Sequence, residues 1–119
     1  MSAELTGVIA EHFAAINASD TDRIVATFAD DAYVNDHRNV FEGITAIRDW
    51  IEREIVGDAV TIDVVDVRDH YGDAIVDGRY DGTYDKTNLP DDFVLTHYFS
   101  VRENKIVSLI IIFNQPLAE

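Results

Sequence analysis

The sequence predicts an α+β domain in which helices come first and a long antiparallel sheet follows. In most of the first half, apolar residues recur with the three-to-four-residue spacing of helix faces, whereas after Gly57 they alternate with a period of two. A length of 119 residues is a common size for one domain. We therefore expect a single domain over residues 1–119.

The first two helices are recognisable from their apolar faces and their start signals. Residues 4–18 carry apolar side chains along one face, and His12 lies on the same stripe. A second, short helix is expected to begin at Ser19 or Asp20, because both residue types are frequent N-caps.

The middle of the chain is expected to form a short strand and a third helix. Tyr33 and Val34 suggest the strand, which runs into the polar stretch 35–39. The third helix follows Gly43 and carries Trp50 on its apolar side.

The second half is expected to form a meander of long antiparallel strands, joined by turns at residues 69–73 and 102–105. Strands of this length should bend strongly. One strand carries Gly78 and Gly82 beside Tyr80 and Tyr84, which indicates either a bend or a cavity. The expected strands are residues 60–70, 74–84, 92–102 and 105–114.

Alternation assigns the faces of the last two strands. His97 shares a face with Leu95 and Phe99. The final strand is apolar on both faces, so that Ile110 and Ile112 are placed on one face and the residues between them on the other. A strand without a polar face is typical of a subunit contact, and we expect a homodimer built on the outer face of the sheet.

Composition excludes several partners and sites. The net charge of −14 and the absence of a Lys/Arg cluster argue against nucleic acid and anionic membranes as partners. Without cysteine, disulfides and thiolate metal sites are excluded. The sequence has neither a signal peptide pattern nor a bilayer-length apolar run, so we expect a cytoplasmic protein.

Three segments carry a resemblance to a known superfamily. They are Phe28–Val34, Phe41–Trp50 with its aromatic-x-Gly-x-x-Ala-Ile-Arg pattern, and Lys105–Phe113. The chain resembles the nuclear transport factor 2-like superfamily, and within it the polyketide-cyclase-like (SnoaL-like) and ketosteroid-isomerase-like branches. The resemblance implies a cone in which a strongly curved, mostly antiparallel sheet and three N-terminal helices enclose a pocket.

The resemblance also assigns candidate catalytic residues. Asp36 matches the position of the general base of ketosteroid isomerases, His12 that of an oxyanion-stabilising tyrosine, and His97 that of a protonated aspartic acid. A carboxylate in an apolar pocket has a raised pKa and can accept a proton near neutral pH. A histidine there can polarise a carbonyl or relay the proton. The expected pocket lining is Phe13, Tyr33, Trp50, Tyr80, Leu95, Phe99, Ile110 and Ile112.

Each candidate residue also has a structural explanation. A histidine on an apolar stripe is often a satisfied core residue, which applies to His12 and His97. Asp36 can cap the turn that follows it. His37 and His70 are expected near the surface.

Two functions remain open at this stage. One is a cofactor-independent isomerase or cyclase that performs acid–base chemistry on a small, mostly apolar carbonyl compound, with neither a cofactor nor a metal. The alternative is a non-catalytic module that binds a small apolar or aromatic molecule or serves dimerisation.

Overall fold

The computed structural model describes residues 5, 7–70, 73–87, 89 and 93–113. The helices are α1 (Gly7–Asn17), α2 (Thr21–Ala26) and α3 (Ile44–Trp50), and α3 continues directly into a π-helical segment, η1 (Ile51–Val56). The strands are β1 (Phe28–Asp36), β2 (Asn39–Glu42), β3 (Thr61–His70), β4 (Asp73–Asp81), β5 (Val94–Arg102) and β6 (Lys105–Ile112).

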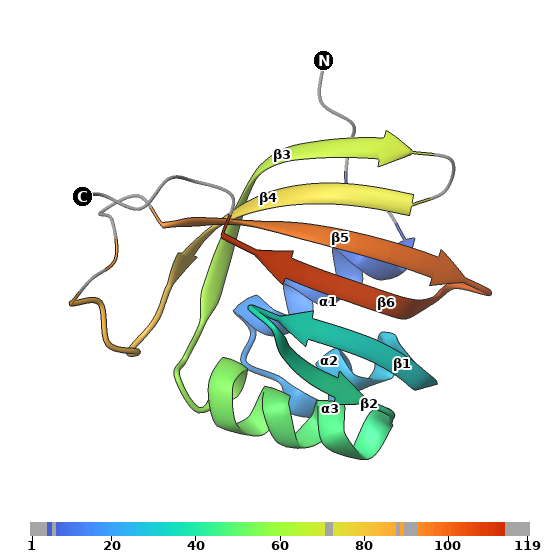
Figure 1. The fold of residues 1–119 in the computed structure, drawn as a ribbon, viewed down its shortest axis with the longest axis horizontal. Coiled ribbons are helices and arrows are strands. Elements are labelled where there is room, and N and C mark those ends of the chain that lie inside the picture. Colours follow the sequence, from blue (N-terminus) through green and yellow to red (C-terminus); the bar gives the residue numbers. More distant parts are fainter. Residues whose placement is uncertain (1–4, 6, 71–72, 88, 90–92, 114–119) are drawn as a thin grey trace.

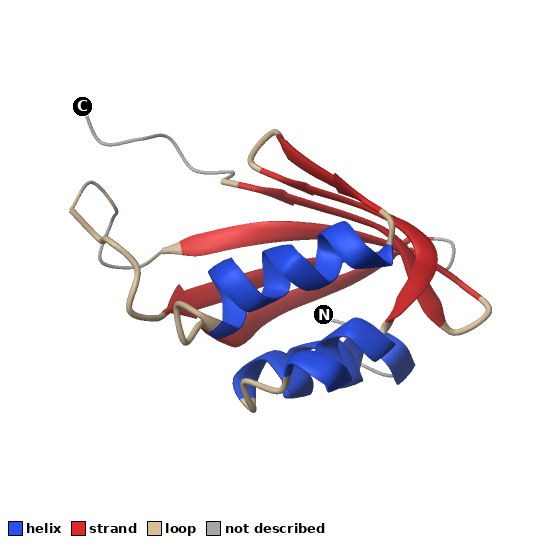
Figure 2. Ribbon diagram, turned by 90° about the horizontal axis from the view of Figure 1, so that it is seen from below, coloured by secondary structure: helices blue, strands red, loops and turns tan. Residues whose placement is uncertain are grey.

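The six strands form one sheet in the order β2-β1-β6-β5-β4-β3 (Figure 1). All neighbours are antiparallel except β1 and β6, which are parallel. The helices lie on one side of this sheet, within its curve (Figure 2). The predicted α+β class and the mostly antiparallel, strongly curved sheet are confirmed.

The curvature of the sheet is concentrated in β3 and β4. Figure 1 shows both strands bending together, and the register of the pair shifts between Val64 and Asp66. An extra residue on one strand of a pair bends and twists it locally. The bend separates the sheet into a part that packs on α1 and a part that extends beyond it.

Several element boundaries agree with the local sequence signals. Asp20 is the N-cap of α2, and its carboxylate accepts a hydrogen bond from the Arg23 backbone N–H at 3.2 Å. The turn between β5 and β6 consists of Glu103 and Asn104, both at positive φ. The expected turn at residues 69–73 includes residues 71–72, which lie outside the described part of the chain.

The predicted inner face of β5 is confirmed, but that of β6 is wrong. Leu95, His97 and Phe99 are buried on the concave side. The register between β5 and β6 shifts between Ser100 and Val101, so that strict alternation along β6 is interrupted. Beyond this irregularity the buried residues of β6 are Leu109 and Ile111.

Ile110 and Ile112 therefore do not line the pocket. Ile110 lies opposite Tyr98 and Ile112 opposite Thr96, both on the convex face of β5. One additional residue in a strand moves every later side chain to the other face. The sequence pattern of β6 could not reveal this shift, because both of its faces are apolar.

Candidate functional site

Asp36 ends strand β1 at the concave face. The chain then reverses in a two-residue turn, in which His37 and Arg38 have φ of 53° and 74°. The side chain of Asn35 accepts a hydrogen bond from the Arg38 backbone N–H at 2.8 Å. Asn35 therefore stabilises the turn, and the carboxylate of Asp36 is not used for this purpose. The polar stretch from residue 35 to residue 39 is thus a hairpin rather than a loop, and β2 follows it.

The carboxylate of Asp36 contacts helix α3. The indole Nε1–H of Trp50 donates to Oδ2 at 3.2 Å, and Nδ1 of His37 lies 3.8 Å from Oδ1. Burial raises the pKa of Asp36, and the contacts with Trp50 and His37 oppose this change. Asp36 is consequently a fixed carboxylate whose proton affinity exceeds that of an exposed aspartate.

A cavity of about 340 Å³ adjoins this carboxylate. Aromatic rings and aliphatic side chains from η1, β4, β5, β6 and the segment between β4 and β5 form much of its wall. Its described lining is Asp36, His37, Asn39, Trp50, Glu54, Ile55, Asp58, Val60, Tyr80, Tyr84, Leu89, Phe93, Leu95 and Ile111. The combination of a buried carboxylate with aromatic walls is typical of a small-molecule site.

His97 reaches this cavity through Tyr80 and does not line it. Its Nδ1 lies 2.9 Å from the carbonyl oxygen of Val76, and its Nε2 lies 2.6 Å from the hydroxyl of Tyr80. A carbonyl can only accept, so Nδ1 carries the proton and Nε2 accepts from Tyr80. Burial lowers the pKa of His97 to about 4, so the neutral form dominates at neutral pH.

This tautomer determines what Tyr80 can offer a ligand. Because its hydroxyl proton is donated to His97, the phenol oxygen presents an acceptor to the cavity and not a donor. Burial raises the pKa of Tyr80 well above its ordinary value, and the charge of Asp36 adds to this effect. Tyr80 and His97 are thus a fixed, neutral pair.

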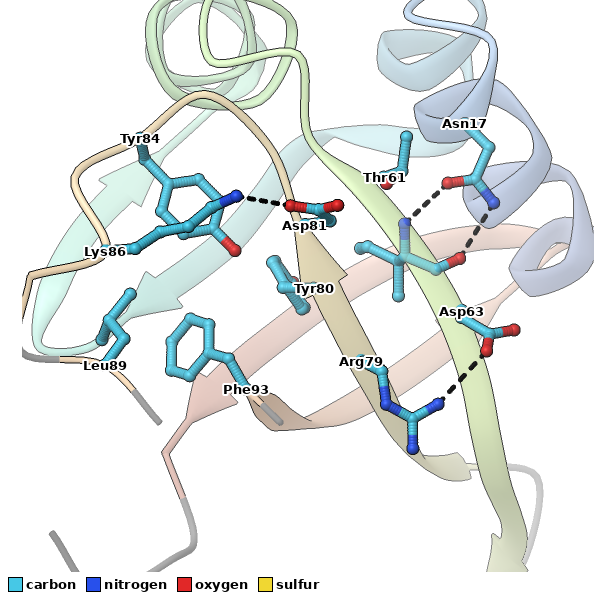
Figure 3. Close-up of a pocket in the computed structure, with 11 residues that line it drawn as sticks. Asn17, Thr61, Asp63, Arg79, Tyr80, Asp81, Tyr84, Lys86, Leu89 and Phe93 are labelled. Atoms are coloured by element: carbon cyan, nitrogen blue, oxygen red, sulfur yellow. Dashed lines mark hydrogen bonds and ion pairs between the residues drawn. The ribbon is translucent and has the colours of Figure 1, made fainter. Parts of the chain in front are cut away.

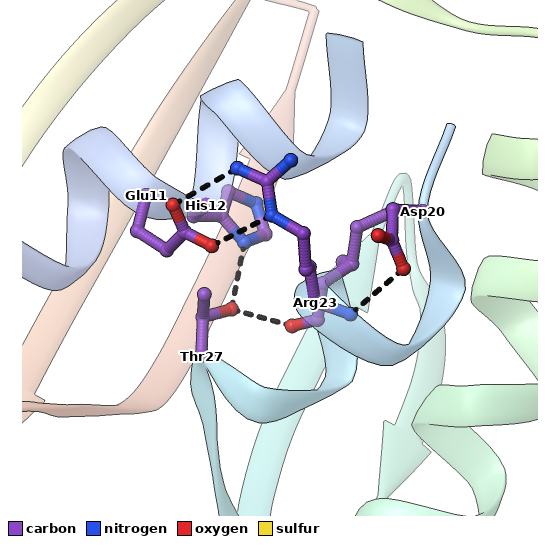
Figure 4. Close-up of polar contacts among 6 residues, drawn as sticks. Glu11, His12, Asp20, Arg23 and Thr27 are labelled. Carbon is purple, nitrogen blue, oxygen red and sulfur yellow. Dashed lines mark hydrogen bonds and ion pairs between the residues drawn. The ribbon is translucent and has the colours of Figure 1, made fainter. Parts of the chain in front are cut away.

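His12 is a core residue and is not near Asp36. Its Nδ1 donates to the hydroxyl of Thr27 at 3.1 Å, and that hydroxyl donates to the carbonyl of Ile24 at 2.6 Å (Figure 4). The rings of Phe28 and Phe99 approach the imidazole edge-on, each with a centroid distance of 5.4 Å. Burial lowers the pKa of His12 to about 3. His12 does not line the Asp36 cavity.

The other expected lining residues fall into three groups. Trp50, Tyr80 and Leu95 line the Asp36 cavity. Phe13 and Phe99 are packed against the histidines in the core instead. Tyr33 lies opposite Ser108 on the convex side, as Ile110 and Ile112 do, where its hydroxyl accepts from the Asn35 side chain at 3.3 Å.

Several lining residues were not predicted from the sequence, and four of them illustrate why. Glu54 and Asp58 come from η1 and the turn after it, while Phe93 and Ile111 come from the sheet side. Glu54 follows Trp50 by four residues, a spacing that places both on one helix face, and this signal was available in the sequence.

The glycine pattern on β4 reflects close packing and leaves no empty space at Gly78. A Cβ at Gly78 would lie 2.5 Å from Cγ2 of Ile62 and 3.3 Å from Cε1 of His97. A larger residue would therefore displace the side chain of Ile62 and press against the imidazole of His97.

A second cavity of about 470 Å³ shares Tyr80, Tyr84, Leu89 and Phe93 with the first (Figure 3). Its charged side chains are paired with one another. Arg79 contacts Asp63 at 3.3 Å, and Lys86 contacts Asp81 at 2.6 Å. Asn17 exchanges two hydrogen bonds with the backbone of Ile62, which ties α1 to β3. We regard the Asp36 cavity as the better candidate site, because its carboxylates are less fully paired.

Within the described part of the chain, no three His, Cys, Asp or Glu residues lie close enough together to hold a metal ion. His70, the remaining histidine, is the last residue of β3 and pairs with Asp73 of β4. Among the described helices, none is long and apolar enough to cross a bilayer.

Comparisons with solved structures support the fold. A provisionally named polyketide cyclase from Sinorhizobium meliloti superposes with a TM-score of 0.81 and 24% identity, covering 91% of this chain and 95% of that one. TerC co-crystallised with polyporic acid superposes with a TM-score of 0.75 and 13% identity, covering 90% of this chain and 88% of that one. A protein with a ketosteroid isomerase-like fold from Catenulispora acidiphila DSM 44928 was solved in complex with trimethylamine. It superposes with a TM-score of 0.73 and 18% identity, covering 89% of this chain and 84% of that one.

At these identities the likeness shows the fold alone. A search of functionally curated proteins found no match. The model of the SnoaL-like domain family, in contrast, matches residues 9–109, which span all the elements from α1 to the middle of β6. The chain therefore belongs to the SnoaL-like domain family, within the nuclear transport factor 2-like superfamily.

Proposed function

We propose that this domain binds a small, mostly apolar or aromatic carbonyl compound in the Asp36 cavity, and that Asp36 accepts a proton from it. The observation that carries the proposal is the half-buried carboxylate, whose pKa is raised and whose Oδ2 is fixed by Trp50 at the wall of an aromatic cavity. A base with a raised pKa is suited to removing a weakly acidic proton next to a carbonyl. No cofactor is required for this step.

The proton transfer can be written with this chain's own groups. A C–H bond next to the ligand carbonyl breaks, its proton passes to the carboxylate of Asp36, and the electron pair forms an enolate. Return of the proton to another carbon completes an isomerisation, and attack of the enolate on a second carbonyl closes a ring. Tyr80 and His97 hold the wall of the cavity in place.

One observation favours the alternative, which is binding without turnover. The ring protons of His97 and His12 are committed to Val76 and Thr27, so neither histidine donates to an enolate oxygen. In this alternative Asp36 serves to orient a ligand. Small molecules in structural relatives, polyporic acid and trimethylamine among them, are compatible with either function.

Hydrogen–deuterium exchange distinguishes the two. The neutral ketone 2-tetralone is incubated with the protein in D₂O, and loss of its α-proton signals is followed by NMR. We expect exchange above the buffer rate, and we expect Asp36→Asn to slow it by about 10²-fold or more. Asp31→Asn is the matched control, because Asp31 is an exposed residue of the same strand.

Two results would count against catalysis by Asp36. Exchange that persists in Asp36→Asn assigns the base to another residue. A ketone that shifts the indole resonance of Trp50 without exchanging its protons supports the binding module.

We also propose a homodimer through the convex face of the sheet and a cytoplasmic location. Tyr98 is 37% exposed there, beside the half-buried Ile110 and Ile112. Light scattering measures the oligomeric state directly.

A further inference from the structure

The lining of the Asp36 cavity includes three carboxylates. Asp36 stands at the end of β1, Glu54 lies on η1 one turn after Trp50, and Asp58 lies in the turn that follows. Partial burial raises the pKa of Glu54, and the negative charges of Asp36 and Asp58 raise it further, while Arg53 opposes them. The negative charges of Asp36 and Asp58 therefore both act on Glu54.

Basic groups compensate this charge incompletely. Arg53 approaches Glu54 at 4.0 Å, but it also contacts Asp49 at 3.4 Å and is exposed. Lys and Arg are missing from the described lining of the cavity. The residues outside the described ranges contain neither type in their sequence. His37, at 3.8 Å from Asp36, is the basic residue within the lining.

Aromatic rings form another large part of the lining. The rings of Trp50, Tyr80, Tyr84 and Phe93 all line the cavity. The face of an aromatic ring carries partial negative charge and attracts cations. Lys86 illustrates this attraction in the same wall, because its Nζ lies 5.6 Å from the centroid of the Tyr84 ring, on the side of the second cavity.

The hydrogen-bonding groups complete the pattern. The indole proton of Trp50 is donated to Asp36, and the hydroxyl proton of Tyr80 is donated to His97. What these two residues and the carboxylates offer to a ligand is therefore lone pairs and ring faces. A positively charged nitrogen finds both acceptors and aromatic rings among them.

We propose that the ligand of this cavity carries a positively charged nitrogen, as an amine or quaternary ammonium group on an apolar or aromatic body. The ammonium group lies against Glu54 and Asp58, which leaves Asp36 facing the rest of the ligand. This inference rests on the proposed function in one respect, namely that the Asp36 cavity is the ligand site.

Three probes of matched shape test the proposal: phenethylamine, 2-phenylethanol and phenylacetate. Trp50 is the only tryptophan of the chain, so its indole N–H resonance and its fluorescence report on this cavity specifically. We expect the amine to bind about tenfold more tightly than the alcohol, and the carboxylate to bind more weakly than the alcohol.

The charge of the cavity is tested by Glu54→Gln combined with Asp58→Asn. This double variant should bind the amine about tenfold less tightly and the alcohol unchanged. Glu103→Gln is the matched control, because Glu103 is exposed in the turn between β5 and β6, at the opposite end of those strands. Unchanged circular dichroism and urea midpoints establish that the variants are folded.

The outcomes separate this inference from the proposed function. Binding of the alcohol as tight as that of the amine overturns the cationic ligand and leaves the cavity as a site for neutral molecules. Equal loss of amine and alcohol binding in the double variant likewise rejects a charge-based preference. Failure of all three probes to shift the Trp50 resonance overturns both the inference and the proposed ligand site.

Discussion

The two ends of the concave face treat their polar side chains in opposite ways. Around His12 the polar groups are paired inside the protein, and the aromatic rings of Phe28 and Phe99 fill the remaining space. Around Asp36 the aromatic rings do not fill the space but line a cavity of about 340 Å³. Both ends combine titratable groups with apolar surroundings, which is why the sequence marked both as candidate sites.

The difference teaches which observation separates a core residue from a site residue. Burial lowers the pKa of His12 to about 3 and that of His97 to about 4, yet these histidines are satisfied within the core. A perturbed pKa is therefore not a sufficient criterion for function. Asp36 differs because its carboxylate adjoins a cavity that a ligand can enter.

The largest expected effect comes from truncating a core side chain in the packed region around His12, which we call the filled end. Phe99→Ala should lower the free energy of unfolding by about 3–5 kcal/mol, because Phe99 is fully packed and its loss leaves a cavity. Phe93→Ala should cost less than half as much, since Phe93 already borders the cavity and is only half-buried. Urea denaturation of both variants measures the contrast. Equal losses would contradict the distinction between the two ends.

Acid should destabilise the filled end. In the unfolded chain the histidines have a pKa of about 6.5, whereas in the folded protein burial lowers the pKa of His97 to about 4 and that of His12 to about 3. Between these values the unfolded chain binds more protons, so the free energy of unfolding falls as the pH decreases. At about pH 5 each histidine should cost about 2 kcal/mol. Asp36 acts in the opposite direction and offsets part of this loss, because burial raises its pKa.

Urea midpoints measured at neutral pH and at about pH 5 test this expectation, together with NMR titration of the histidines. We expect the Cε1 protons of His12 and His97 to keep their neutral shifts down to about pH 5. Titration of both near 6.5 would mean that the filled end is open to water.

The smallest effect concerns the boundary between the two ends. Tyr80→Phe removes the hydroxyl that donates to Nε2 of His97, which should cost about 1–3 kcal/mol because the nitrogen is buried. Tyr98→Phe is the control, since Tyr98 is exposed on the convex face and should change stability little. ¹⁵N spectra of the imidazole would show whether Nδ1 carries the proton. A protonated Nε2 in the wild type would reverse the direction of the Tyr80 hydrogen bond.

The sequence by itself determined the order of helices and strands and several of their boundaries. Periodicity depends on neighbours along the chain, and so do the N-cap at Asp20 and the Glu103–Asn104 turn. The alternation that placed His97 and Phe99 inside held for the same reason, since β5 carries polar residues on one face. The resemblance to the superfamily identified Asp36 as a candidate.

Only the tertiary structure decided which candidates meet. The register shift in β6 places Leu109 and Ile111, instead of Ile110 and Ile112, on the concave face. A strand that is apolar on both faces has no sequence pattern that could predict this shift. Asn35, rather than Asp36, accepts the hydrogen bond from the Arg38 backbone N–H in the turn. The pairing of His97 with Tyr80 and of His12 with Thr27 joins residues 17 and 15 positions apart. Such contacts depend on how distant elements pack, and that packing is a property of the whole chain rather than of any local segment.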